Sequence, residues 1–216
     1  MFNLKIGVRL CLLVAFMAVI LVGIGTYSLN SLSASNAIIK TVYEDSVVTM
    51  GQIAEMARLN SFNRVDILAA LEDPRPEVIT QRTANVEENI KKINDLWKEF
   101  TSASLTPEGK VLADKFAEDR RKLTEDGFLP MIAALRANKI EEARKIKADH
   151  LVPNSKPLIE DSRNIIQLQK DVAKALYDKS QKDYSLIRNI SVSSIIVGML
   201  FSIIFAWWII NSVIMR

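Results

Sequence analysis

The chain has 216 residues, a formal net charge of +3, one cysteine and one histidine. Its charge excess lies at the ends, because Lys5 and Arg9 are the only charged residues before Lys40 and Arg216 is the only one after Arg188. Removing these three from the 28 basic residues leaves 25, which balance the 25 acidic residues of the middle. The balanced middle excludes a nucleic-acid-binding surface, which needs a concentrated basic face.

The first apolar segment, residues 10–39, carries no formal charge and is dominated by aliphatic side chains. It exceeds the roughly 20 residues that a helix needs to cross a bilayer. We therefore expect a first transmembrane helix at residues 10–30, with residues 1–9 in the cytoplasm because basic residues precede the span. The competing interpretation is a signal peptide cleaved near residues 35–37, but the apolar run is longer than a usual signal core.

The second apolar segment, residues 189–215, also lacks formal charges. We expect a second transmembrane helix at residues 190–212, with Trp207 and Trp208 near its end, where aromatic residues favour the membrane interface. Arg216 then predicts that residues 213–216 form a cytoplasmic end. The two spans place residues 31–189 on the periplasmic side of a bacterial inner membrane.

The first half of this middle segment predicts two helices. The first leaves the membrane and runs to about Leu71. Asp73-Pro74-Arg75-Pro76 ends it, because proline lacks an amide donor and restricts the residue before it. The second runs from about Pro76 to Phe100, with apolar residues at three- and four-residue steps, and a turn at Thr101–Ser104 follows.

The second half predicts a third and a fourth long helix. Thr106-Pro107-Glu108 is a favourable helix start, with a capping hydroxyl, a proline in the first turn and an acid near the positive dipole end. The third helix should bend at Gly127 and Pro130, and it should end near Asn138. A short helix is expected at about Ile140–Ala148. A last helix, opened by the segment Pro153–Pro157, should continue without a break into the second span.

The four amphipathic helices predict the fold. None can bury its apolar stripe alone, and the turns between them are short. The economical arrangement is an all-α, antiparallel up-down-up-down four-helix bundle flanked by two transmembrane helices. No segment outside the spans favours a β-strand.

Polar side chains interrupt the apolar stripes in the half of the bundle far from the membrane. They are Asn60, Asn63 and Arg64 on the first helix, Arg82 on the second and Arg136 on the third. Burying such groups without partners is costly, and the planar arginine fork can donate two parallel hydrogen bonds to one carboxylate. We predict that Arg64, with Asn60, Asn63 and Arg82 or Arg136, binds a small anionic ligand such as an organic acid. The alternatives are a dimer contact or a solvated arginine.

No catalytic or metal-binding pattern accompanies these residues. The sequence has no G-x-S-x-G, phosphate-binding glycine loop, CxxC or pair of histidines. His150, the only histidine, has no cysteine beside it, so a zinc site is not expected. We expect no enzyme activity, no catalytic residue, no metal and no cofactor.

Several local patterns suggest a family. They are Tyr43-Glu44-Asp45, Ile53, Arg64, Asp73-Pro74, Glu141-Glu142-Ala143, Leu151-Val152-Pro153, Pro157-Leu158, Gln169, Ala173, Ser180 and Tyr184. With the order of span, bundle and span, the chain resembles the sensor region of methyl-accepting chemotaxis proteins that have a four-helix-bundle ligand-binding domain. The resemblance implies a membrane-embedded parallel homodimer that binds a small ligand and shifts its last helix relative to its first. Some related sensors bind carboxylates near their distal ends through arginines of the first helix.

The chain departs from that family at its end. Family members continue into a HAMP linker and a cytoplasmic coiled coil, whereas this sequence stops at Arg216, where such a linker would begin. It is either a fragment or a stand-alone sensor whose cytoplasmic signalling partner is unknown. The same bundle could also be the input module of a sensor kinase or of a cyclic-dinucleotide enzyme. A non-sensing membrane adaptor is a further alternative.

Overall fold

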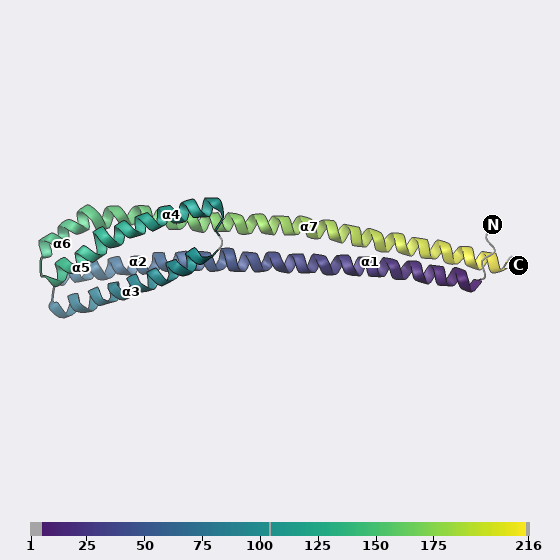
Figure 1. The fold of residues 1–216 in the computed structure, drawn as a ribbon, viewed down its shortest axis with the longest axis horizontal. Coiled ribbons are helices and arrows are strands. Elements are labelled where there is room, and N and C mark those ends of the chain that lie inside the picture. Colours follow the sequence, from purple (N-terminus) through teal and green to yellow (C-terminus); the bar gives the residue numbers. More distant parts are fainter. Residues whose placement is uncertain (1–5, 104, 215–216) are drawn as a thin grey trace. The chain divides into compact units, whose positions relative to one another are not determined.

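The computed structural model describes residues 6–103 and 105–214, and within them every regular element is helical (Figure 1). The elements are α1 (Ile6–Thr41), η1 (Val42–Val48), α2 (Thr49–Glu72), α3 (Pro76–Ser102), α4 (Pro107–Lys122), η2 (Leu123–Phe128), α5 (Leu129–Arg136), α6 (Ile140–Ile146), η3 (Lys147–Leu151) and α7 (Val152–Ile214). The three η elements are π-helical. Together the described elements form four helical rods, which confirms the predicted all-α four-helix bundle.

The turns between rods follow the expected local chemistry. Pro76 occupies the first turn of α3, directly after the break at Asp73. The Thr106 hydroxyl accepts a hydrogen bond from the Gly109 amide at 3.1 Å and so caps α4. Asn138 closes α5 with a positive φ of 56°, a conformation that asparagine tolerates better than most residues. These three helix boundaries lie where the sequence predicts them.

The last rod differs from the prediction. A break was expected at Pro153, but α6, η3 and α7 follow one another without an interruption from Ile140 onward. Pro153 and Pro157 both lie inside this continuous rod, where neither can donate a backbone hydrogen bond. The π-helical turn of η3 directly before α7 changes the hydrogen-bond register there. In the third rod, η2 contains Gly127 and precedes Pro130, so the expected irregularity takes the form of a π-helix.

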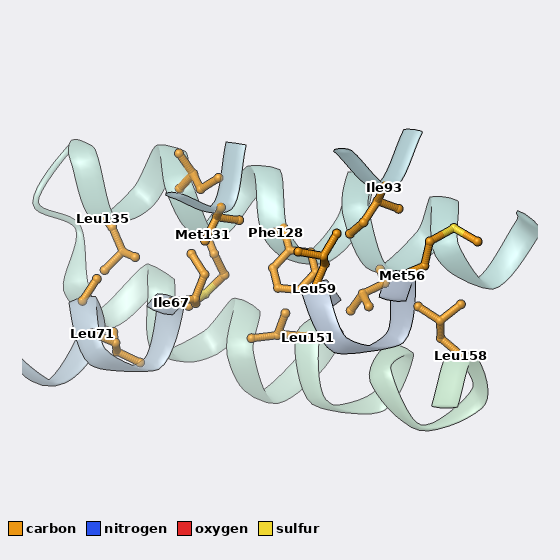
Figure 2. Close-up of a cluster of buried hydrophobic side chains, with 14 of the residues drawn as sticks. Met56, Leu59, Ile67, Leu71, Ile93, Phe128, Met131, Leu135, Leu151 and Leu158 are labelled. Atoms are coloured by element: carbon orange, nitrogen blue, oxygen red, sulfur yellow. The ribbon is translucent and has the colours of Figure 1, made fainter. Parts of the chain in front are cut away.

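The chain divides into two compact units, and the first to describe is the bundle of residues 41–174. All four rods contribute to its core, and Figure 2 shows part of the cluster. The buried side chains drawn there with labels are Met56, Leu59, Ile67, Leu71, Ile93, Phe128, Met131, Leu135, Leu151 and Leu158. Trp97 lies against two more phenylalanines, with ring centroids 5.2 Å from Phe100 and 5.4 Å from Phe116. The core therefore ties α3 to α4 through aromatic stacking as well as aliphatic packing.

The second unit consists of residues 1–40 and 175–216. The rings of Phe16 and Phe201 are tilted by 44° with their centroids 4.4 Å apart, and the Ser202 hydroxyl lies 2.9 Å from the Met17 sulfur. Most of the large apolar side chains in this unit are exposed. Among the described residues, two helices, Leu10–Glu72 and Ile140–Asn211 with neighbouring elements counted together, are long and apolar enough to cross a membrane. Lys5, Arg216 and the side chain of Arg9 lie outside the description, so the orientation and the limits of the spans stay predictions.

Replacing Gly51 with alanine should raise the free energy of unfolding of the bundle by about 0.5–1 kcal/mol, because a glycine inside a helix costs that much relative to alanine. A Cβ atom at Gly51 would meet nothing within 4 Å. Gly127→Ala is the matched control, since its Cβ would lie 3.4 Å from the Leu151 side chain. Denaturant unfolding of the full chain in detergent micelles measures both, and a larger gain at Gly127 would contradict the prediction.

Candidate ligand-binding site

Arg64 and Asn60 lie together in a narrow groove between α2 and α7. The groove is lined by Ala57, Asn60, Ser61 and Arg64 of α2, by Leu123 of η2, and by Ser155, Leu158, Ile159 and Ser162 of α7. The four α2 residues recur at helical steps of three and one, so a single face of the helix presents them. The free space is about 20 Å³, which is enough for about one water molecule. Two of the five predicted site residues therefore meet in one place.

The groove offers hydrogen-bond donors that the protein leaves unused. Arg64 is partly buried and makes no ion pair or hydrogen bond with any described residue. The Asn60 amide nitrogen is buried and lacks a hydrogen-bond partner in the described structure. The hydroxyl protons of Ser155 and Ser162 are used, because they are donated to the carbonyls of Leu151 and Leu158.

The groove carries one cation and no carboxylate among its lining residues. A buried donor without an acceptor costs about 1–3 kcal/mol. The arrangement is therefore suited to an acceptor that carries negative charge.

Asn63 lies on a different face of α2, toward α3, and Arg82 lies on α3 itself. The Asn63 carbonyl oxygen accepts a hydrogen bond of 2.9 Å from Asn89, and Arg82 forms an ion pair of 2.7 Å with Asp66. An open groove of about 380 Å³ lies beside this ion pair. Its lining carries two acids, Asp66 and Glu88, and two bases, Arg82 and Lys92. The charge of Arg82 is thus already balanced by a neighbouring helix.

Arg136 is held by α3. Its two terminal nitrogens each donate to a carboxylate oxygen of Glu87 at 2.8 Å, and its Nε donates to the Thr83 hydroxyl at 3.0 Å. This hydrogen bonding lowers the pKa of the Glu87 carboxyl below its ordinary value. Arg136 therefore clamps α5 to α3, and the structure does not bring Arg82, Arg136 or Asn63 into the groove of Arg64 and Asn60.

The serines of the groove were not among the predicted site residues. Ser155 and Ser162 are seven residues apart and both buried on α7, on the face that also carries Leu158. The signal was present, since small polar residues interrupt an apolar stripe there as Asn60 does on α2. It was hidden because Ser155 falls in a proline-flanked segment that resembles the opening of a helix.

The family of the chain follows from comparison with known proteins. The family of the four helix bundle sensory module for signal transduction matches residues 3–184. The chain belongs to this family. The resemblance to methyl-accepting chemotaxis proteins is thereby confirmed. A comparison with the curated proteins finds no match, and a comparison with the solved structures finds none either.

As a four-helix-bundle sensory module, the chain is a signal transduction sensor of the chemoreceptor type. The matched region contains the bundle of residues 41–174 and all five predicted site residues. With two helices that are long and apolar enough to cross a bilayer, this sensory module is a membrane protein.

Proposed function

We propose that the chain is a transmembrane chemoreceptor-type sensor that binds a small carboxylate in the periplasm and transmits a helix shift to a cytoplasmic signalling partner. The observation that carries the proposal is the pair of unused donors at Arg64 and Asn60 in a groove without a carboxylate. A guanidinium can donate two parallel hydrogen bonds to one carboxylate, and an amide can donate a third.

The size of the groove supports a mechanism. A space of about 20 Å³ holds one water molecule but not a carboxylic acid. The acid therefore enters only when α7 moves away from α2, and it binds that open arrangement more tightly than the closed one. A ligand shifts a conformational equilibrium only through such a difference in affinity.

The topology proposed is two-pass. Residues 10–30 and 190–212 cross the inner membrane, the bundle lies in the periplasm, and both termini lie in the cytoplasm. Support comes from the charge distribution of the sequence, because Lys5, Arg9 and Arg216 flank the apolar segments. We also propose a homodimer, which the membership of the sensory-module family supports.

Arg64→Ala should weaken the binding of acetate or succinate by about 10- to 100-fold, because hydrogen bonds to charged groups contribute about 1.5–3 kcal/mol and each 1.4 kcal/mol is tenfold. Isothermal titration calorimetry of the full chain in lipid nanodiscs measures the affinity. Arg64→Lys keeps the charge but loses the fork, so it should restore only part of the affinity.

Arg58→Ala is the matched control. Arg58 lies on the same helix but is exposed and paired with Glu55 at 2.5 Å, outside the groove. Its removal should leave affinity unchanged. Equal losses in the two alanine variants, an unchanged affinity in Arg64→Ala, or no heat from either acid with the wild-type chain would each contradict the carboxylate site.

A further inference from the structure

A polar cluster around the buried Asp161 joins α4 to α7 and shares no residue with the lining of the Arg64 groove. Asp161 of α7 is fully buried. One of its carboxylate oxygens, Oδ1, accepts a hydrogen bond from the Lys115 ammonium of α4. The other, Oδ2, is buried and has no hydrogen-bond partner among the described residues. The Lys115 ammonium also lies 3.9 Å from the carboxyl of Asp119, one helical turn further along α4, so the two carboxyls lie beside the same cation.

This geometry destabilises the contact between α4 and α7 when both carboxyls are ionised. Two carboxylates that face each other repel, and an ionised carboxylate can only accept hydrogen bonds. The unpartnered Oδ2 of Asp161 then has no donor in reach from Asp119. A proton on Asp119 changes both conditions, because it removes one negative charge and supplies an O–H group that can donate to Asp161.

We propose that Asp119 takes up a proton in acid and donates it in a hydrogen bond to Asp161, so that the two side chains form a pH-operated clasp that tightens the contact between α4 and α7. The proton is the ligand of this site. Its binding adds one charge-assisted hydrogen bond between the two helices, of the short and strong kind that joins an O–H group to a carboxylate.

The surrounding charges set the strength of the clasp. Burial raises the pKa of the Asp119 carboxyl, and the hydrogen bond and negative charge of Asp161 raise it further. Lys115 and Lys122 of α4 lower it in part, from 3.9 and 3.8 Å. Lys122 lies closer to Glu118, at 2.7 Å, and on α7 the charge of Glu160 acts on Lys115. Together these effects raise the pKa of the Asp119 carboxyl above its ordinary value of 3.8.

The sign of the pH dependence follows from this direction. Because the folded-state pKa of Asp119 lies above the unfolded value, the folded state holds the proton more tightly. The stabilising contribution of the clasp is complete when the pH lies below 3.8, the ordinary pKa of an aspartate carboxyl. It is lost as the pH rises through the raised pKa. Acid therefore favours the closed contact of α4 with α7.

The clasp also bears on the proposed ligand site, a consequence that rests on the proposed function. Asp161 lies in the same turn of α7 as Ile159 and Ser162, which line the Arg64 groove. Proton binding would thus hold this turn of α7 toward α4 while the groove lies between α7 and α2.

The test is Asp119→Asn, in which the side-chain amide supplies the donor at every pH. The melting temperature of the full chain in detergent micelles is measured from about pH 4 to pH 8 for variant and wild type. The contributions of the other carboxyls to the pH dependence cancel in the difference between the two proteins. The variant should be more stable than wild type at neutral pH by on the order of a few degrees. The difference should vanish toward pH 4.

Glu118→Gln is the matched control, since Glu118 is exposed on the neighbouring position and its pKa is lowered by Lys122. A difference between Asp119→Asn and wild type that stays constant with pH would overturn the proposal. A pH-dependent difference of the same sign in Glu118→Gln would overturn it as well. If Asp119→Asn does not fold, infrared titration of the wild-type chain decides, because a protonated aspartate must persist above the ordinary range, and its absence overturns the clasp.

Discussion

Replacing Phe116 with alanine is expected to lower the free energy of unfolding of the bundle by about 3–5 kcal/mol, the usual cost of removing a buried aromatic ring. Phe116 is fully buried on α4, and its ring lies 5.4 Å from the ring of Trp97 on α3 at an interplanar angle of 26°. The substitution removes the ring contact, leaves a cavity between the two helices and exposes one face of Trp97. Both helices lose their common aromatic contact, so little local rearrangement can fill the space.

Trp97 also provides the measurement. The chain has three tryptophans, and the other two, Trp207 and Trp208, lie in the second unit. With those two changed to phenylalanine, the fluorescence of the full chain in micelles reports on the bundle core alone during denaturant unfolding. Phe116→Ala should both shift the midpoint and change the native emission.

Phe62→Ala is the matched control because it removes the same ring from an exposed position. Phe62 is 48% exposed and lies under the Arg58 guanidinium, 4.7 Å from its ring centroid. An exposed cation–π contact contributes about 0.5–1 kcal/mol, so the loss should be several times smaller than at Phe116. Equal losses at the two positions would show that the core does not lie between α3 and α4.

Local chemistry explains why the fold could be predicted. The turn between α2 and α3 is determined by neighbouring residues, because Pro74 and Pro76 prevent a helix from continuing through it. The start of α4 is equally local, because the Thr106 hydroxyl needs only the amide of Gly109. Such signals need no knowledge of the other helices, and the positions between them carry apolar residues at helical spacing.

The partners of the arginines could not be predicted in the same way. A helical stripe indicates which residues face inward, but the rotation of each helix decides which neighbour they meet. Arg82 meets Asp66 from 16 positions away, and Arg136 meets Glu87 from 49 positions away. The sequence contains many acids that could serve. Only the packed bundle selects these two and leaves Arg64 without one.

The π-helices were unpredictable for a related reason. A π-helical turn inserts one residue into the hydrogen-bond register, and neighbouring packing decides whether that insertion is favourable. In η2, the residue that packs closely is Gly127, where an added Cβ would lie 3.5 Å from the backbone of Leu151 in η3. The π-helices η2 and η3, which belong to different rods, therefore pack against each other. This contact cannot be predicted from the local sequence of either segment.

Asn60→Leu should raise the free energy of unfolding by about 1–3 kcal/mol, the cost of a buried donor without an acceptor. Asn60 is only 8% exposed, and its amide nitrogen has no partner in the described structure. Leucine has the same branching at Cγ and can extend toward Leu123 and Leu158, which line the same groove. Denaturant unfolding followed by Trp97 fluorescence measures the change.

Asn63→Leu separates this effect from a general gain in hydrophobicity. Asn63 lies three residues further along α2 and is also buried with an unpartnered amide nitrogen, but its carbonyl oxygen accepts a hydrogen bond from Asn89. Leucine there would remove that acceptor, so Asn63→Leu should gain less than Asn60→Leu or lose stability. A larger gain at Asn63 would contradict the assignment of an unused donor at Asn60.

The gain at Asn60 should be accompanied by a loss of binding. If the unused amide donor serves a carboxylate, Asn60→Leu removes one hydrogen bond to a charged acceptor and should weaken acetate or succinate binding by about 10-fold or more. A residue that costs stability and supplies affinity is expected in a binding site, because stabilising a site commonly lowers its function. A variant that is more stable and still binds either acid with wild-type affinity would leave Arg64 as the only donor for the ligand and place Asn60 outside the site.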